Sequence, residues 1–199
     1  SGNVIGLYSV NNKNPDHGTL IQAYLTYHEQ FAQLPIYHKK AQALLAENDT
    51  PILRIHLLYK KQPWNTTTEY LKQHTPENPD AVTCYRIGKA FSHTRDVKNA
   101  VNWLQLAVVK DDTYFEYKSE LGSNLIKMNR LAEAEDVLLK SINQFGEYGP
   151  SLNNLGFLYI QTRQYAKAKK YLEESLRLDP DNMNAKENLV LLYYQLGDT

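Results

Sequence analysis

The chain has a single cysteine, Cys84, among its 199 residues, and it has no long hydrophobic run. One cysteine excludes an intramolecular disulfide, so packing must hold the fold. It is compatible with the cytoplasm or with a bacterial periplasm, and it does not identify the compartment. No segment approaches the roughly 18 apolar residues of a membrane-spanning helix. Because neither an initiator methionine nor a secretion-type segment is present at Ser1, we expect a mature form or a piece of a longer polypeptide.

An excess of charge of either sign is also missing. The 22 basic and 22 acidic side chains cancel and are scattered along the chain, so no basic field is available for a phosphate backbone or an anionic lipid. We therefore expect no nucleic acid partner and no direct membrane insertion. With 42% hydrophobic residues, the chain has enough apolar surface to fold as an extended domain.

Arrangements of residues typical of catalysis are absent as well. His28-Glu29 begins like the helix of a zinc protease, but Ala32 occupies the place of the second histidine. The six histidines are dispersed, and none has a cysteine or carboxylate at ligand spacing. No acid, base and nucleophile occur together, so hydrolase activity is not supported. We expect that the chain is not an enzyme and binds neither a metal nor a cofactor.

What the sequence does contain is a frame that recurs every 34 residues. Each copy has a large residue before a glycine, a large residue four places beyond it, and small and apolar residues on a following segment. Such a period is typical of an array of helical hairpins. The copies are Ile87-Gly88, Phe91, Ala100, Leu104, Ala107; Leu121-Gly122, Leu125, Ala134, Leu138, Ser141; and Leu155-Gly156, Tyr159, Ala168, Leu172, Ser175 with Pro180, and a fourth begins with Leu189-Val190 and Tyr193.

The residue types in this frame follow from packing. Each unit is two amphipathic helices that cannot bury their apolar faces alone, so neighbouring units must stack into a shared core. Large residues at i and i+4 lie on one helical face and pack against the next helix. The small residues, such as Gly122 and Ala134, are where two helices approach closely, and a larger side chain there would overpack the contact.

Over residues 81–199 the frame resembles the tetratricopeptide repeat family. The last complete unit matches the family's Trp, Leu-Gly, Tyr, Ala, Phe and Pro pattern with Leu152, Leu155-Gly156, Tyr159, Ala168, Leu172 and Pro180. Cys84, Lys118 and Leu152 stand at the tryptophan place, and Asp112 and Gly146 at the closing proline place. The resemblance implies an all-α, right-handed superhelix of stacked antiparallel hairpins. It also implies a concave surface that binds peptides or partner domains without catalysis.

We expect four regions along the chain. Residues 1–16 form a short extended N-terminal arm or the remnant of an upstream domain, and 17–80 form degenerate hairpins. Residues 81–182 form three regular units, and 183–199 form a final or capping helix. The expected helices are near 51–61, 66–74, 82–94, 96–109, 115–128, 130–143, 149–162, 164–177 and 184–196. We also expect a turn at Pro63-Trp64-Asn65 and Asp181 or Asn182 as N-cap of the last helix.

The resemblance also implies which residues line the concave face, because in the family the first helix of each unit provides them. Tyr85, Phe157 and Tyr194 are the expected aromatic anchors. Lys89, Lys127, Asn153 and Gln161 are expected to hold a peptide's carboxylates and backbone. The full predicted set is Tyr85, Lys89, His93, Ser119, Ser123, Lys127, Asn153, Asn154, Phe157, Gln161, Glu187, Asn188 and Tyr194.

Three alternatives stay open at this point. Asn154 and Asn188 either bond a bound peptide backbone, as related arrays do, or join helix to helix. The groove residues are either a binding site or the solvated face of a structural spacer. The chain is either an independent binding module or the docking arm of a larger enzyme or membrane-associated protein.

One binding mode of the family is not expected here. Chaperone-binding members use basic and amide residues as a clamp for the terminal carboxylate of a peptide, and this chain does not have those residues at the corresponding places. Self-association through the open end near Leu189 and Tyr193 is a further expectation.

Overall fold

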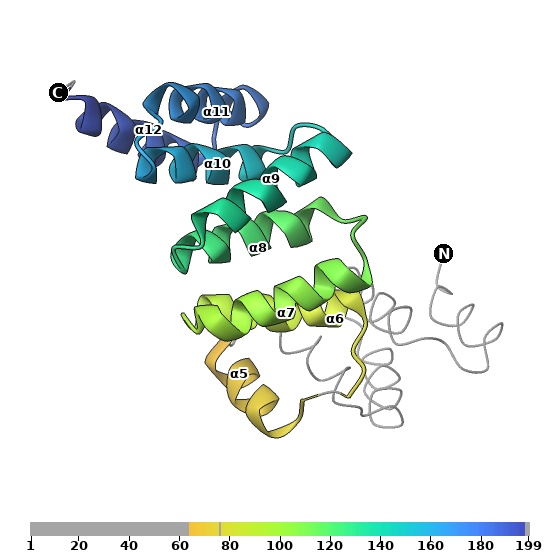
Figure 1. Cartoon of the computed structure of the whole chain (residues 1–199). Coiled ribbons are helices and arrows are strands. Elements are labelled where there is room, and N and C mark those ends of the chain that lie inside the picture. The colour runs from red at the N-terminus through yellow and green to blue at the C-terminus, as the bar shows by residue number, and fades with distance from the viewer. Residues whose placement is uncertain (1–63, 76, 198–199) are drawn as a thin grey trace, which may run out of the picture. The chain divides into compact units, whose positions relative to one another are not determined.

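The computed structural model describes residues 64–75 and 77–197 (Figure 1). Its internal contacts divide the chain into two units, Ser1–Pro79 and Asp80–Thr199, and each is described here by itself. The predicted arm over 1–16, the hairpin that follows it, the helix over 51–61 and the His28-Glu29 motif lie outside the described residues.

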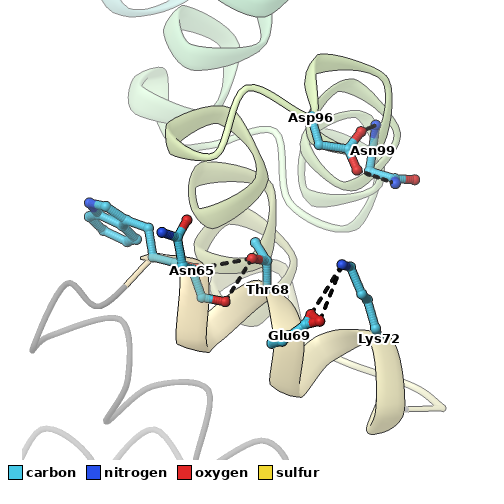
Figure 2. Close-up of polar contacts among 7 residues, drawn as sticks. Asn65, Thr68, Glu69, Lys72, Asp96 and Asn99 are labelled. Atoms are coloured by element: carbon cyan, nitrogen blue, oxygen red, sulfur yellow. Dashed lines mark hydrogen bonds and ion pairs between the residues drawn. The ribbon is translucent and has the colours of Figure 1, made fainter.

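The described part of the first unit is the helix α5 (Trp64–Gln73). Sequence analysis placed Trp64 and Asn65 in a turn, and that placement was wrong, because both belong to the first turn of α5. The Thr68 hydroxyl lies within hydrogen-bond distance of the carbonyl oxygens of Trp64 and Asn65, at 3.1 and 3.0 Å (Figure 2). This bonding of a threonine to the preceding turn is compatible with a helix.

Seven helices make up the second unit, and every regular element in residues 80–197 is a helix. The predicted boundaries are confirmed to within two residues. The helices are α6 (Ala81–His93), α7 (Val97–Lys110), α8 (Phe115–Lys127), α9 (Leu131–Phe145), α10 (Gly149–Gln161), α11 (Tyr165–Leu178) and α12 (Met183–Leu196).

The helices of this unit pair in chain order and then stack. α6 packs against α7, α8 against α9, and α10 against α11, while α12 packs against α10 and α11 (Figure 1). The first helices of successive pairs also contact one another, since α8 packs against both α6 and α10. The unit is therefore an all-α superhelix of helical hairpins, as the repeat frame predicted.

The frame residues lie where the packing argument placed them. The large residues Ile87, Leu121 and Leu155 are buried, and Ala100 and Ala134 are fully buried on the second helices. Each frame glycine faces a leucine of its own hairpin: Gly88 faces Leu104, Gly122 faces Leu138 and Gly156 faces Leu172. The recurring core is thus a leucine seated on a glycine within every hairpin.

The turns inside the hairpins repeat with the same period. Arg95, Asn129 and Arg163 have φ of 62°, 58° and 58°, and Gly197 has φ of 83°. In each of the three hairpins the residue after this position donates its N–H to a frame carbonyl, as Gln164 does to Tyr159 O at 2.8 Å. Asparagine and glycine tolerate this left-handed conformation, but arginine adopts it at a cost.

Short polar side chains cap the starts of three helices of this unit, α6, α7 and α12. Asp96 accepts hydrogen bonds from the backbone N–H and the side chain of Asn99 at the start of α7 (Figure 2). The predicted N-cap of the last helix is confirmed, because Asn182 Oδ1 accepts from the N–H of Ala185 at 3.2 Å. These caps satisfy backbone donors that a helix cannot satisfy internally.

Lys118 stands at the family's tryptophan place and is buried. Its Nζ donates to the Asp112 carbonyl at 3.0 Å and to Gln144 Oε1, and it lies 4.9 Å from the centre of the Phe145 ring. Gln144 also donates to the Asp112 carbonyl, at 3.3 Å. The linker between α7 and α8, which lacks the closing proline, is therefore held by side-chain hydrogen bonds.

Candidate functional site

The predicted site residues of the second unit all lie on the first helices, α6, α8, α10 and α12. One partly exposed side chain from each forms a row at equivalent places of the frame, which we call the ninth-place row: Lys89, Ser123, Phe157 and Leu191. The chemistry of this row changes along the array. It begins with an ammonium group, passes a hydroxyl, and ends with an aromatic ring and an aliphatic side chain.

Positive groups gather at the α6 and α8 end of this row. Lys127 Nζ donates to Ser92 Oγ of α6 at 3.4 Å, so it reaches from one first helix to its neighbour. Burial lowers the pKa of His93, and the charge of Lys89 and then that of Lys127 lower it further against the opposing effect of Glu120. His93 is exposed and lies among these charges. With its imidazole neutral, the two lysines still outnumber Glu120, so this end of the row is basic.

Lys89 has a partner that the sequence analysis did not assign. Its Nζ lies 3.7 Å from Glu120 Oε2, with both side chains about one quarter exposed. Glu120 occupies the frame place that Asn154 and Asn188 occupy in the later units. A carboxylate there can accept but not donate, so its partner across the helix interface is a cation. The sequence signal that could have predicted this ion pair is Lys89, which stands on the first helix of the preceding repeat.

Asn154 and Asn188 join neighbouring first helices. Asn154 Nδ2 donates to the Ser119 carbonyl of α8 at 3.1 Å, and Asn188 Nδ2 donates to Asn153 Oδ1 of α10 at 2.9 Å. Of the two readings left open, the contacts present are helix-to-helix ones. Ser119 is only 5% exposed, so its hydroxyl offers little surface to a ligand.

The three predicted aromatic anchors have different surroundings. Tyr85 is half-buried, and its ring centre lies 4.8 Å from that of Tyr117 on α8. Phe157 is partly exposed in the ninth-place row. Tyr194 is 71% exposed near the end of α12. Tyr85 thus contributes to the packing of α6 against α8 as well as to the surface, whereas Phe157 is a partly exposed member of the ninth-place row.

The remaining predicted residues are accessible. His93, Lys127, Gln161 and Glu187 are exposed, and Ser123 and Asn153 are partly exposed. Within residues 64–75 and 77–197, no three histidine, cysteine or carboxylate side chains lie close enough together to hold a metal ion. In that same part of the chain, no helix combines the length and the hydrophobicity needed to cross a membrane.

Comparisons with known proteins agree with this architecture. Residues 150–182 match the family model described as tetratricopeptide repeat. The auxiliary subunit NAA15 of the N-terminal acetyltransferase A complex from Arabidopsis thaliana is 26% identical over 120 residues, covering 60% of this chain and 13% of that protein. The chain therefore spans only a small part of that relative's length.

Solved structures resemble the fold over larger shares. MamA (41-end) from Desulfovibrio magneticus RS-1 has a TM-score of 0.60 at 20% identity, covering 72% of this chain and 82% of that one. YrrB, described as having an unusual peptide-binding site, has a TM-score of 0.53 at 18% identity, covering 92% and 86%. The first repeat domain of Spaghetti (RPAP3) bound to the HSP90 peptide SRMEEVD has a TM-score of 0.55 at 18% identity, covering 59% and 94%. These similarities concern the fold.

Proposed function

We propose that this chain, which belongs to the tetratricopeptide repeat family, is a non-catalytic interaction module whose first helices form a concave face that receives an extended peptide or a helix of a partner protein. The observation that carries this proposal is the ninth-place row, in which Lys89, Ser123, Phe157 and Leu191 are all partly exposed. A row that crosses four successive helices offers a continuous strip to a single ligand.

The pattern of helix contacts supports a concave arrangement of these helices. First helices contact first helices, as α8 does with α6 and α10, and α10 does with α12. Among residues 80–197, no contact of similar extent joins α7 to α9 or α9 to α11. The layer whose members lie closer together forms the inside of a curved stack, and extended concave surfaces of this kind are typical binding surfaces of repeat proteins.

The length and chemistry of the row indicate the kind of ligand. Packed helices lie about 8–10 Å apart, so four of them span roughly 30 Å, the length of about nine extended residues. Lys89 and Lys127 favour acidic groups at one end of the ligand, and Phe157 with Leu191 favours an apolar side chain at the other. Fold similarity to YrrB and to the RPAP3 domain, whose descriptions name peptide binding, is consistent with such a ligand.

Peptide display tests the proposal without a known partner. Peptides selected on the wild-type chain are measured by fluorescence polarisation against a groove variant, Lys127→Ala with Phe157→Ala. The matched control, Val109→Ala with Lys140→Ala, alters one apolar and one basic exposed residue on the second helices α7 and α9. We expect the groove variant to lose at least about tenfold in affinity, since a central aromatic residue often contributes most of the binding energy.

Urea denaturation verifies that each variant is folded before its affinity is read. Two results would refute the concave face as the binding surface. In the first, the selected peptides bind the groove variant as tightly as the wild type. In the second, the Val109→Ala, Lys140→Ala control loses affinity and the groove variant does not.

A second candidate rests on the similarity to NAA15, an auxiliary subunit of an acetyltransferase complex, of which this chain spans 13%. In this version the chain is the docking part of a larger assembly whose catalytic part lies elsewhere. Affinity purification of the full-length gene product distinguishes the two. Recovery of a catalytic subunit in constant proportion favours the docking role, and recovery of short-motif partners alone favours the independent module.

A further inference from the structure

α12 presents an apolar stripe that nothing in the described part of the chain covers. Met183, Val190 and Tyr194 follow one another along one face of the helix and are 64%, 70% and 71% exposed. Together with Lys186, Glu187 and Leu191 they line a shallow groove of about 520 Å³. We call Met183, Lys186, Val190 and Tyr194 the α12 stripe.

The same frame places are interior in the preceding unit. Gly149, Leu152, Gly156 and Ile160 stand 34 residues before the four members of the α12 stripe, and all four are buried. The helix α11 covers this face of α10, with Leu172 seated on Gly156. The exposed face of α12 is therefore the one on which, in the other hairpins, a second helix lies.

In its other contacts α12 is a regular first helix. Asn188 bonds to Asn153 of α10, as Asn154 bonds to Ser119 one unit earlier. Ala185 and Leu192 are fully buried. Gly197 has the left-handed conformation of Arg95, Asn129 and Arg163 at the ends of the earlier first helices. The helix is thus placed and oriented as if to receive a second helix.

One residue changes what that second helix can be. Val190 stands at the glycine place, where even a single β-carbon on Gly88, Gly122 or Gly156 would lie 2.5–2.7 Å from a leucine carbon. A valine adds two further methyl groups, so a leucine cannot seat at this place with the same helix separation. The face is built for a smaller residue on its partner.

We propose that the α12 stripe is a second interaction surface, which borders the ninth-place row at Leu191. Its partner is an amphipathic helix that lies antiparallel on α12 with alanine, serine or glycine facing Val190. The argument is continuity with the interface that α11 makes on α10, modified by the size of one side chain. Val190 then acts as a specificity determinant, because it admits a small residue and rejects the leucine that the other hairpins use.

The α11 sequence supplies the probe. A synthetic peptide of Tyr165–Leu178, held helical by a lactam between Lys169 and Glu173, is compared with the same peptide carrying Leu172→Ala. Lys169 and Glu173 are exposed and four residues apart, so the lactam lies away from the packing face. Binding of both peptides is measured by fluorescence anisotropy on the wild-type chain and on Val190→Gly.

We expect the Leu172→Ala peptide to bind the wild-type chain at least about tenfold more tightly than the unchanged peptide, and the order to reverse on Val190→Gly, which restores a glycine under the leucine. Val109→Gly on α7, another strongly exposed valine, controls for a glycine in a helix and should leave the wild-type order in place. Circular dichroism establishes that both variants are folded.

The same order of affinities on both chains, or no binding of either peptide at millimolar concentration, would overturn the proposal. So would sedimentation showing a dimer of the wild-type chain that Val190→Asp abolishes, because a second copy of the chain would then be the occupant. The groove variant Lys127→Ala with Phe157→Ala should bind both peptides normally, which separates this result from the test of the concave face.

Discussion

Leu172 fills the space directly over Gly156, so closely that a β-carbon on the glycine would lie 2.5 Å from Leu172 Cγ. The contact joins α10 to α11 across the centre of the last complete hairpin. Gly122 and Leu138 have the same relationship one unit earlier, with a corresponding distance of 2.6 Å. The glycine is therefore required for space and not for backbone conformation.

We expect Gly156→Ala to destabilise the protein by about 1–3 kcal/mol, because Leu172 must leave its rotamer or the two helices must separate. This outcome runs against helix propensity, which by itself favours alanine over glycine by about 1 kcal/mol. The free energy of unfolding from urea titration measures the difference.

The same helix contains the control for this prediction. A β-carbon on Gly149 would meet nothing closer than Ser175 Oγ at 3.8 Å, which is an ordinary contact. Gly149→Ala should therefore leave stability unchanged or raise it by up to about 1 kcal/mol. Equal destabilisation by the two substitutions would contradict the packing account.

The turn between α10 and α11 offers a stabilising substitution. Arg163 has φ of 58°, a conformation that costs an L-residue with a long side chain about 1–2 kcal/mol. Arg163→Gly should raise the free energy of unfolding by about 1 kcal/mol, offset in part by the greater entropy of glycine in the unfolded chain. Asn129→Gly is the comparison, and it should gain less because asparagine tolerates this conformation. A loss of stability in Arg163→Gly would show that its side chain makes a contribution larger than the strain.

The buried lysine at the tryptophan place allows a test of the linker. Lys118→Met removes the donor to the Asp112 carbonyl and to Gln144 while keeping most of the side-chain volume. We expect a loss of about 1–3 kcal/mol, because the two hydrogen bonds from the charged, buried Lys118 ammonium group are removed. Lys140→Met removes an exposed ion pair with Asp136 and should change stability by less than about 0.5 kcal/mol. Differential scanning fluorimetry and urea titration of the two variants provide the measurement.

Alkaline pH should weaken the fold. Burial raises the pKa of the Cys84 thiol from 9.0 to about 11, and burial together with nearby negative groups raises the pKa of Tyr117 from 10.0 to about 12. The unfolded chain then binds fewer protons than the native one between these values, so stability is fully present below pH 9 and falls as pH rises from about 9 to about 12.

Thermal unfolding at intervals between pH 8 and pH 11 follows this loss, and Cys84→Ala should reduce the part of it that lies between about pH 9 and 11. At pH 8 the Cys84 thiol of the native protein should not react with iodoacetamide, because it is both buried and protonated. It should react only once the chain has unfolded. Stability that stays constant up to pH 11 would mean that neither group is as buried as the structure has it.

Much of the architecture could be predicted from the sequence by itself. The helical spacing of apolar residues predicts each helix, and the 34-residue repeat predicts that adjacent helices pair and stack. The helices of residues 80–197, the buried Ile87, Leu121 and Leu155, and the glycine places all follow from side-chain spacing and size. The start of α5 was missed, since the bonds from Thr68 to the Trp64 and Asn65 carbonyls are not visible in composition.

Only the tertiary structure decided which polar side chains face a neighbouring helix and which face solvent. Asn154 and Asn188 donate to the preceding first helix, Ser119 is buried beneath such a contact, and Lys89 meets Glu120. These outcomes depend on how far each hairpin is rotated and displaced relative to the one before it. Residue spacing along one helix does not determine that rotation, because it results from the packing of all side chains between two hairpins at once.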